Sequence, residues 1–288
     1  MRKAPFVAPR LLLGAESLLG VSRGSRDRML EIAARYTDPE TLAVTLAKAL
    51  AAGAEGVLAS PSPQLKAALA ELRQTVPIYA LLPNVPQYVR DASDLGLMGT
   101  ALKRVGRSGP LTLARLGLTG LGHLGAVLSG DLSGTVPLLL ELEAAQLGAT
   151  DIRAVVLAAP LTDLALAGRH RRFFERYCRF ARRRFRAAGL ETHNLGHLLA
   201  RLREWKLRPD LVVGPVNPIG LMMKPDVAAV LAELRAAEFP VLAKELRAGG
   251  SVRLGEGARF ARERGAYGVV ADLVDVEDLT PEFKALSA

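Results

Sequence analysis

The sequence has a single cysteine and few aromatic residues, and both shortages limit what the protein can be. One cysteine, Cys178, permits no disulfide within the chain and no metal site built from cysteine ligands. This cysteine usage is typical of a reducing compartment, so we expect a cytoplasmic protein. Aromatic residues make up 5% of the chain while 50% of it is hydrophobic, so a large core must be built mainly from leucine, valine and alanine.

Long apolar runs and cofactor signatures are also missing. The most apolar stretch, Leu111–Leu132, is interrupted by Arg115, His123 and Asp131, so we expect no membrane span. No apolar region with a small-residue cleavage site follows the amino terminus, so we expect no signal peptide. The sequence contains no Gly-x-Gly-x-x-Gly motif, Walker loop or Gly-x-Ser-x-Gly elbow. It therefore has no nucleotide cofactor motif and no nucleophile signature of a named enzyme family.

What the sequence does contain is a repeated alternation of short apolar runs and longer helical patterns. The candidate strands, rich in valine, leucine and isoleucine, are residues 10–14, 56–59, 77–82, 152–158, 190–193, 211–214, 240–244 and 267–271. Helical patterns lie between them, and one begins with Asp38 as N-cap and Pro39 at its first position. The alternation indicates parallel strands covered by helices, and 288 residues suit one eight-fold barrel. We predict an α/β fold, a single (β/α)8 TIM barrel over residues 1–288.

One connection between candidate strands is much longer than the others. The third strand ends near residue 82 and the fourth begins near residue 152, which is too far apart for a single helix. We predict a helical insertion over residues 85–150, with helices at 88–105, 111–128 and 136–147. Its apolar character favours burial against the barrel mouth or another subunit, so we expect a homo-oligomer.

Polar residues at strand ends are the candidate catalytic residues, because barrel enzymes carry their chemistry where strands end and the next loops begin. Lys244 ends the seventh candidate strand. A buried lysine is costly unless it is paired or chemically active, and burial would lower its pKa and suit it to Schiff-base or general-base work. The alternative is an ion pair with a carboxylate near a neighbouring strand end, such as Glu16 or Asp272. Those two carboxylates are themselves candidates for moving protons.

Glu191, His193 and His197 form the one cluster of histidines in the sequence. Glu191 and His193 are two residues apart and would share one face of a strand. His193 is a candidate acid or base, and together with Glu191 it could bind a divalent metal. No helix with a His-Glu-x-x-His pattern accompanies them, and His197 could simply begin the next helix. Beyond this candidate metal site the sequence identifies no cofactor.

Candidate substrate-binding residues lie in three loops. Asn84 follows the third strand. Asn217 lies in residues 214–220, where two prolines and two glycines fix a loop that could aim the amide at a substrate or at local backbone. The candidates after the seventh strand are Arg247, Gly249, Gly250 and Ser251. Glycine-rich backbone beside an arginine could cradle a phosphate group.

Positive charge is concentrated in residues 169–186, which hold nine arginines and one glutamate, a local charge of +8 out of a net +9. Apolar residues recur there at spacings of three and four, which predicts an Arg-rich amphipathic helix with one face on the barrel. We interpret the arginines as a solvated outer face with ion pairs to other elements, and Cys178 as a packing residue. No recognised nucleic-acid module accompanies them, so a nucleic-acid partner is not expected.

The last part of the chain resembles the closing quarter of aldolase-type and phosphate-binding TIM barrels. The residues that carry the resemblance are Pro-Val-Leu-Ala-Lys at 240–244, Ala-Gly-Gly at 248–250 and Gly-Ala-Tyr-Gly-Val-Val at 265–270. It departs from those barrels after the eighth strand, where Asp272 stands in place of a small Gly-Ser or Gly-Thr turn. The resemblance implies a small polar, carbonyl-bearing substrate in the barrel mouth, with or without a phosphate group.

Three functional hypotheses follow from these residues. The first is a lyase or isomerase acting next to a carbonyl, with Lys244 as Schiff-base former or electrostatic stabiliser. Glu16 or Asp272 would move protons, and His193 would assist as an acid or base. The second is a hydrolase or isomerase that depends on a divalent metal bound by the Glu-x-His pair. The third is a non-catalytic binding or assembly protein.

Overall fold

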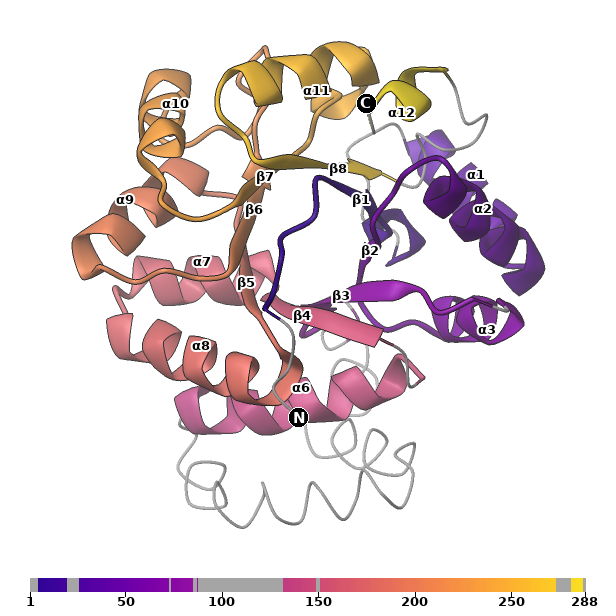
Figure 1. The fold of residues 1–288 in the computed structure, drawn as a ribbon, viewed down its shortest axis with the longest axis horizontal. Helices are drawn as coiled ribbons and strands as arrows, with labels where there is room; N and C mark the ends of the chain where they lie inside the picture. The colour runs from indigo at the N-terminus through magenta and orange to yellow at the C-terminus, as the bar shows by residue number, and fades with distance from the viewer. Residues whose placement is uncertain are drawn as a thin grey trace.

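Eight parallel strands in sequence order form a closed barrel, in which the first strand pairs with the second and the last (Figure 1). This computed structural model describes residues 5–19, 26–72, 74–84, 87, 132–148, 151–272 and 281–286. The strands are β1 Leu11–Gly14, β2 Val57–Ala59, β3 Pro77–Leu82, β4 Asp151–Leu157, β5 Ala188–Glu191, β6 Leu211–Pro215, β7 Val241–Lys244 and β8 Gly268–Asp272. The predicted (β/α)8 TIM barrel is confirmed.

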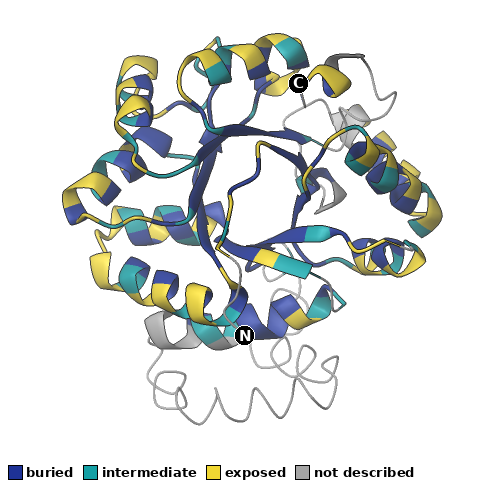
Figure 2. Cartoon of the chain, in the orientation of Figure 1, coloured by how far each residue is buried: buried dark blue, intermediate teal, exposed yellow. Residues whose placement is uncertain are grey.

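Helices surround the ring of strands on its outside, and they expose their outer faces while the strands are buried (Figure 2). They are α1 Arg26–Arg35, α2 Pro39–Ala51, α3 Pro63–Glu71, α6 Leu132–Gln146, α7 Ala159–Ala167, α8 Arg171–Phe185, α9 Leu195–Trp205, α10 Val227–Ala236, α11 Leu254–Glu263 and α12 Pro281–Ala285. Short 3₁₀ helices follow β1 and β7, namely η1 Glu16–Leu19 and η2 Ala248–Gly250. Asp38 caps α2 as predicted, because its side chain accepts from the backbone N–H groups of Glu40 and Thr41.

The alternation of side chains along each strand separates an inner from an outer core. Leu12, Leu58, Val156, Val213 and Leu242 belong to the cluster inside the barrel, whereas their strand neighbours pack outward against the helices. Because side chains alternate faces, the same inward rows continue to the strand ends. The inward residues at the last positions of β5, β7 and β8 are Glu191, Lys244 and Asp272.

The amino-terminal end of the barrel is covered by residues 5–10, which cross it before β1 begins (Figure 1). Phe6 packs edge-on against the Tyr79 ring, with ring centroids 6.4 Å apart. Arg10 donates its backbone N–H to Glu55 at 2.6 Å, and its guanidinium lies 3.7 Å from the centre of the Tyr267 ring. This end is filled by packing, so the open rim for chemistry is the carboxyl end.

The sequence placed seven of the eight strands to within one residue, but it placed the fifth two residues too late. The predicted strand 190–193 is observed at Ala188–Glu191. Ala188 and Gly189 carry no strand preference, so the apolar pattern missed them. Residues 192–194 therefore belong to the rim turn rather than to the strand.

The predicted insertion is described only near its end. Its third helix, predicted at 136–147, is observed as α6 Leu132–Gln146, and the two earlier predicted helices lie outside the described residues. Glu143 on α6 is fully buried and accepts from the Asn84 backbone N–H at 2.6 Å. Glu141 pairs with Arg184 of α8 at 2.9 Å. These two contacts fix α6 against the loop after β3 and against α8.

Within the part of the chain that the structure describes, no helix has both the length and the hydropathy needed to cross a membrane. Residues 111–131 of the apolar stretch noted in the sequence lie outside that part.

Candidate functional site

A buried lysine between two glutamates marks the carboxyl rim of the barrel. The Lys244 Nζ atom lies 2.6 Å from Oε2 of Glu16 and 2.5 Å from Oε1 of Glu191. Glu191 reaches it from the end of β5, and Glu16 reaches it from η1, just after β1. The three residues are far apart in sequence, and closure of the ring brings them together.

The surroundings of this cluster raise the pKa of both Lys244 and Glu191. Burial by itself would lower the pKa of Lys244, but the charges and hydrogen bonds of Glu16 and Glu191 outweigh it and raise that pKa. Burial, followed by the negative charge of Glu16, raises the pKa of Glu191 against the opposing effect of the Lys244 ammonium. The expected lowering of the lysine pKa is therefore wrong. Lys244 is an ammonium ion, and the ion-pair alternative is the one observed.

The three members of the cluster differ in their access to solvent. The side chains of Lys244 and Glu191 are 8% and 2% exposed, whereas that of Glu16 is 22% exposed. Glu191 is further fixed by the backbone N–H of Ala159, which donates to its Oε2 at 3.1 Å. Glu16 is thus the member that a molecule in the barrel mouth would meet first.

Asp272 and His193 stand at the same rim of the barrel. Asp272 ends β8 opposite Gly14 of β1 and is partly exposed. His193 instead faces Asp163 of α7, with its Nδ1 3.3 Å from the Asp163 carboxylate. The strand-end shift explains the separation: β5 ends at Glu191, so His193 does not continue the inward row.

Asp163 organises the turn that follows Glu191. It accepts hydrogen bonds from the Thr192 hydroxyl at 2.5 Å and from the His193 backbone N–H at 3.1 Å. Burial acts to raise the Asp163 pKa, but hydrogen bonds from His193, Thr192 and Asn194 outweigh it and lower that pKa. The carboxylate therefore remains ionised and holds the turn in place.

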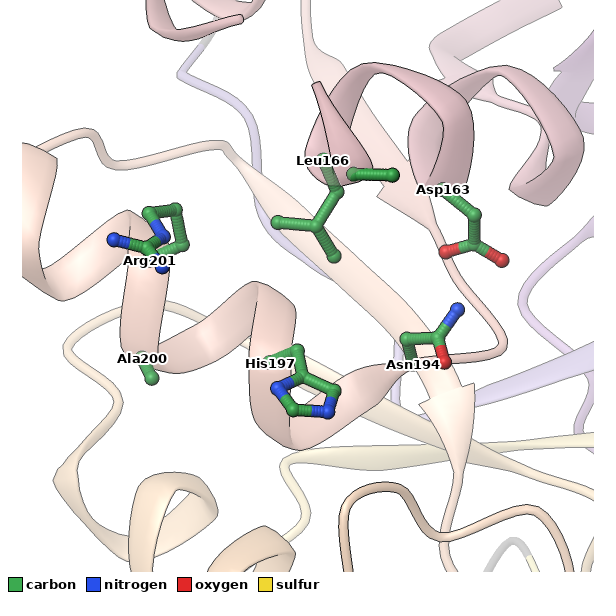
Figure 3. Close-up of a pocket in the computed structure, with 7 residues that line it drawn as sticks. Asp163, Leu166, Asn194, His197, Ala200 and Arg201 are labelled. Atoms are coloured by element: carbon green, nitrogen blue, oxygen red, sulfur yellow. The ribbon is translucent and has the colours of Figure 1, made fainter. Parts of the chain in front are cut away.

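A hollow of about 330 Å³ lies beside this turn, between α7 and α9 (Figure 3). Asp163 and Asn194 lie at one end of the view, and His197 and Arg201 project from α9. His197 is in the first turn of α9 and is exposed. The hollow is outside the ring of strands, so it is separate from the Lys244 cluster.

The two candidate asparagines are engaged within their own loops. Asn84 donates through Nδ2 to the Pro61 carbonyl and accepts through Oδ1 from the Gln87 N–H. Asn217 donates to the Leu221 carbonyl at 2.9 Å and accepts from the Leu221 N–H at 2.8 Å. Both amides thus fix rim loops through backbone groups.

The glycine-rich segment after β7 forms a tight turn. Gly249 and Gly250 adopt φ values of 71° and 100°, a region that suits glycine. The backbone N–H groups of Gly250 and Val252 donate to the Arg247 carbonyl, and that of Ser251 donates to Ala248. These N–H groups are used inside the turn, and the Arg247 side chain is exposed.

The pair of Glu191 and His193 does not form a metal site with other described residues. Glu191 is bound to Lys244, while His193 faces Asp163. Among the described residues, no three or more histidine, cysteine, aspartate or glutamate side chains gather in a way that could hold a metal ion.

Comparison with known proteins assigns this chain to no family. No protein-family model matches the chain, and no curated protein sequence is significantly similar to it. A solved structure described as an aldo/keto reductase from Brucella melitensis is similar, with a TM-score of 0.43 and 12% sequence identity. The match covers 96% of this chain and 93% of that one. The resemblance to TIM barrels holds at the level of architecture because the eight strands of this chain close into a ring.

The hypothesis of a lyase or isomerase is corrected by these findings. The similar structure is named a reductase rather than a lyase or an isomerase. A Schiff base also requires an unprotonated amine, whereas Lys244 is held as an ammonium by two carboxylates. At 12% identity the likeness concerns the fold, and it transfers no reductase activity to this chain.

Sequence reasoning missed how Glu191 and Asp163 are used. Glu191 was considered only as a metal ligand, because it was paired with His193 on one face of a strand that was predicted to continue to residue 193. The observed strand ends at Glu191, which is therefore the last inward-facing residue of β5. Asp163 follows the fourth strand, but its partners lie about thirty residues later at 192–194, so the sequence alone did not connect them.

Proposed function

We propose that this chain is an enzyme that binds a small polar molecule at the carboxyl rim of the barrel and exchanges a proton with it through Glu16. The observation that supports the proposal is the Lys244 ammonium, hydrogen-bonded to Glu16 at 2.6 Å and to Glu191 at 2.5 Å. A buried charged triad is costly to the fold, and such groups are frequent at functional sites.

Each member of the triad has a distinct task in this proposal. Glu16, the most exposed of the three, gives or takes the proton. Lys244 has three N–H groups, two of which serve the carboxylates, so the third can donate to a substrate oxygen that gains negative charge. Glu191, fixed by the Ala159 N–H, positions the ammonium. Asp272 on the neighbouring strand is a second candidate proton carrier.

The charge of the site favours an uncharged or cationic substrate that carries hydroxyl or amino groups. Two carboxylates and one ammonium sum to a net negative charge when all three are ionised, which repels a phosphate. The turn at Arg247, Gly249, Gly250 and Ser251 uses its backbone N–H groups internally, which also disfavours phosphate binding there. Asn84 and Asn217 contribute by fixing the loops around the mouth. Assembly into a homo-oligomer and a cytoplasmic location remain predictions from the sequence.

The test is a comparison of the unmodified protein with Glu16→Gln against a panel of small hydroxyl- and amino-bearing compounds. Thermal shift identifies compounds that bind, and mass spectrometry or proton–deuterium exchange by NMR identifies those that react. We expect a compound that binds both proteins but reacts at least about a hundredfold more slowly with Glu16→Gln, the size typical of a lost acid or base. Glu71→Gln is the matched control, since Glu71 is exposed at the end of α3.

Two results would refute the proposal. The first is equal turnover by the unmodified protein and Glu16→Gln, which would remove Glu16 from the chemistry. The second is a compound that protects the rim but is never altered, which would indicate a non-catalytic binding protein.

A further inference from the structure

The arginine-rich helix α8 has a buried side that fixes its orientation on the barrel. Phe174, Tyr177, Cys178, Ala181 and Phe185 are buried, and the Tyr177 hydroxyl lies 2.9 Å from the Val155 carbonyl and 2.8 Å from that of Gly189. The helix therefore cannot rotate, and its opposite side faces outward (Figures 1 and 2). The apolar side is used entirely for packing.

The arginines at the two edges of α8 are engaged in ion pairs. Arg171 pairs with Glu175 at 2.7 Å, and Arg182 pairs with Asp210 at 2.9 Å. On the other edge, Arg184 pairs with Glu141 of α6 at 2.9 Å. The pairs of Arg182 and Arg184 attach the helix to its neighbours, as the sequence led us to expect of the whole segment, whereas that of Arg171 lies within α8.

Four arginines form a row along the middle of the outer side. Arg172, Arg176, Arg179 and Arg183 are exposed and follow one another at spacings of four, three and four residues. At 100° per residue they lie within about 60° of one another, opposite the buried side. Among the described residues, no ion pair involves Arg172, Arg179 or Arg183. We call these four residues the arginine ridge.

The like charges of the ridge destabilise α8, and the packing of the helix on the barrel does not require them. Like charges at i, i+4 destabilise a helix by a few tenths of a kcal/mol per pair. Eleven residues at 1.5 Å each give the ridge a length of about 16 Å, with a guanidinium every ~5 Å. A row of evenly spaced guanidinium groups matches a flexible chain of phosphates.

We propose that the arginine ridge of α8 binds the phosphodiester backbone of a nucleic acid without reading its sequence. A membrane surface fits less well, because stable membrane binding by a helix uses an apolar face, and that of α8 is buried in the barrel. A single row also suits a linear polyanion better than a plane of headgroups. The ridge lies on the outside of the barrel, so this activity is independent of the rim and of the proposed enzyme.

The test is fluorescence anisotropy with a labelled single-stranded oligonucleotide of mixed sequence, measured between ~50 and ~200 mM salt. We expect the association constant to fall steeply with salt. In the variant Arg172→Gln/Arg179→Gln/Arg183→Gln, the slope of log K against log salt should decrease by about 2, and binding at low salt should weaken at least about tenfold. The substituted side chains are exposed, so circular dichroism should remain unchanged.

A matched variant distinguishes binding by the ridge from a general effect of the protein's net charge. Arg203→Gln/Arg208→Gln/Arg259→Gln removes the same number of charges from other exposed positions and should bind the oligonucleotide as the unmodified protein does. Equal weakening by both variants would overturn the proposal, as would absence of salt-dependent binding. Binding to vesicles that contain phosphatidylserine, with none to the oligonucleotide, would assign the ridge to anionic lipid instead.

Discussion

Replacement of Lys244 by methionine tests whether the buried cluster is an ion triad. Methionine keeps most of the side-chain volume and removes the ammonium, so Glu16 and Glu191 lose their shared partner. Two charge-assisted hydrogen bonds at about 1.5–3 kcal/mol each amount to ~3–6 kcal/mol. Removal of one partner from a buried ion pair costs about 3–5 kcal/mol, which agrees. We expect Lys244→Met to lower the free energy of unfolding by this amount at pH 8.

The loss of unfolding free energy in Lys244→Met should depend on pH. Burial and the charge of Glu16 raise the Glu191 pKa in the folded protein, and Lys244 opposes them, so loss of the ammonium raises it further. A group with a raised folded pKa favours folding below its unfolded value, about 4.3 for glutamate, and this contribution is lost as pH rises through the folded value. Lys244→Met should therefore be least stable at pH 8 and should recover toward pH 5.

Urea unfolding at the two pH values measures both effects, with the fluorescence of Trp205 as the signal because it is the one tryptophan. Lys48→Met is the matched control, since Lys48 is exposed on α2 and should cost less than about 0.5 kcal/mol. Addition of Glu191→Gln should restore part of the loss, because it removes the stranded charge. A Lys244→Met protein as stable as the control at pH 8, or one made worse by Glu191→Gln, would refute the ion triad.

Two further predictions concern groups away from the triad. Asp163→Asn should lower the free energy of unfolding by about 1–2 kcal/mol at pH 7, because it weakens the hydrogen bonds that Thr192 and His193 donate. Because the Asp163 pKa is lowered, its carboxylate stabilises the fold above the unfolded pKa of about 3.9, and this stabilisation is lost as pH falls through the folded pKa. Below that pH, unfolding experiments should give Asp163→Asn and the unmodified protein the same free energy of unfolding. Burial raises the pKa of Cys178 to about 12, so a thiol reagent at pH 8 should label it in urea but not in the folded protein, and rapid labelling of the folded protein would contradict the packing.

The architecture could be predicted because a parallel barrel imposes a strong pattern on the sequence. Its strands are buried on both sides, so they appear in the sequence as short apolar runs. Seven of the eight runs matched closely. The fifth did not, because Ala188 and Gly189 are small residues whose strand conformation is imposed by their neighbours in the ring.

The site was harder to predict because its chemistry depends on distances across the barrel. The sequence could suggest that Lys244 needed a carboxylate and could name Glu16 as one. It could not show that Glu191 completes the triad, since Glu191 and Lys244 are 53 positions apart in the sequence and meet only when the barrel closes. The direction of the Lys244 pKa shift was predicted wrongly for the same reason, because the contact with Glu191 was not known. Likewise, the sequence showed the arginines of α8 but not which of them have partners.

Ring closure gives the order of synthesis a physical consequence. The first strand cannot acquire its second neighbour until β8, some 250 residues later, has been made. At about 5–20 residues per second, β1 has one open edge for roughly 10–50 s. During that time the nascent chain carries an unpaired strand edge, which is a template for association with other chains. Newly made protein therefore remains vulnerable to aggregation until β8 emerges, and a stop codon ahead of β8 would leave it permanently in that condition.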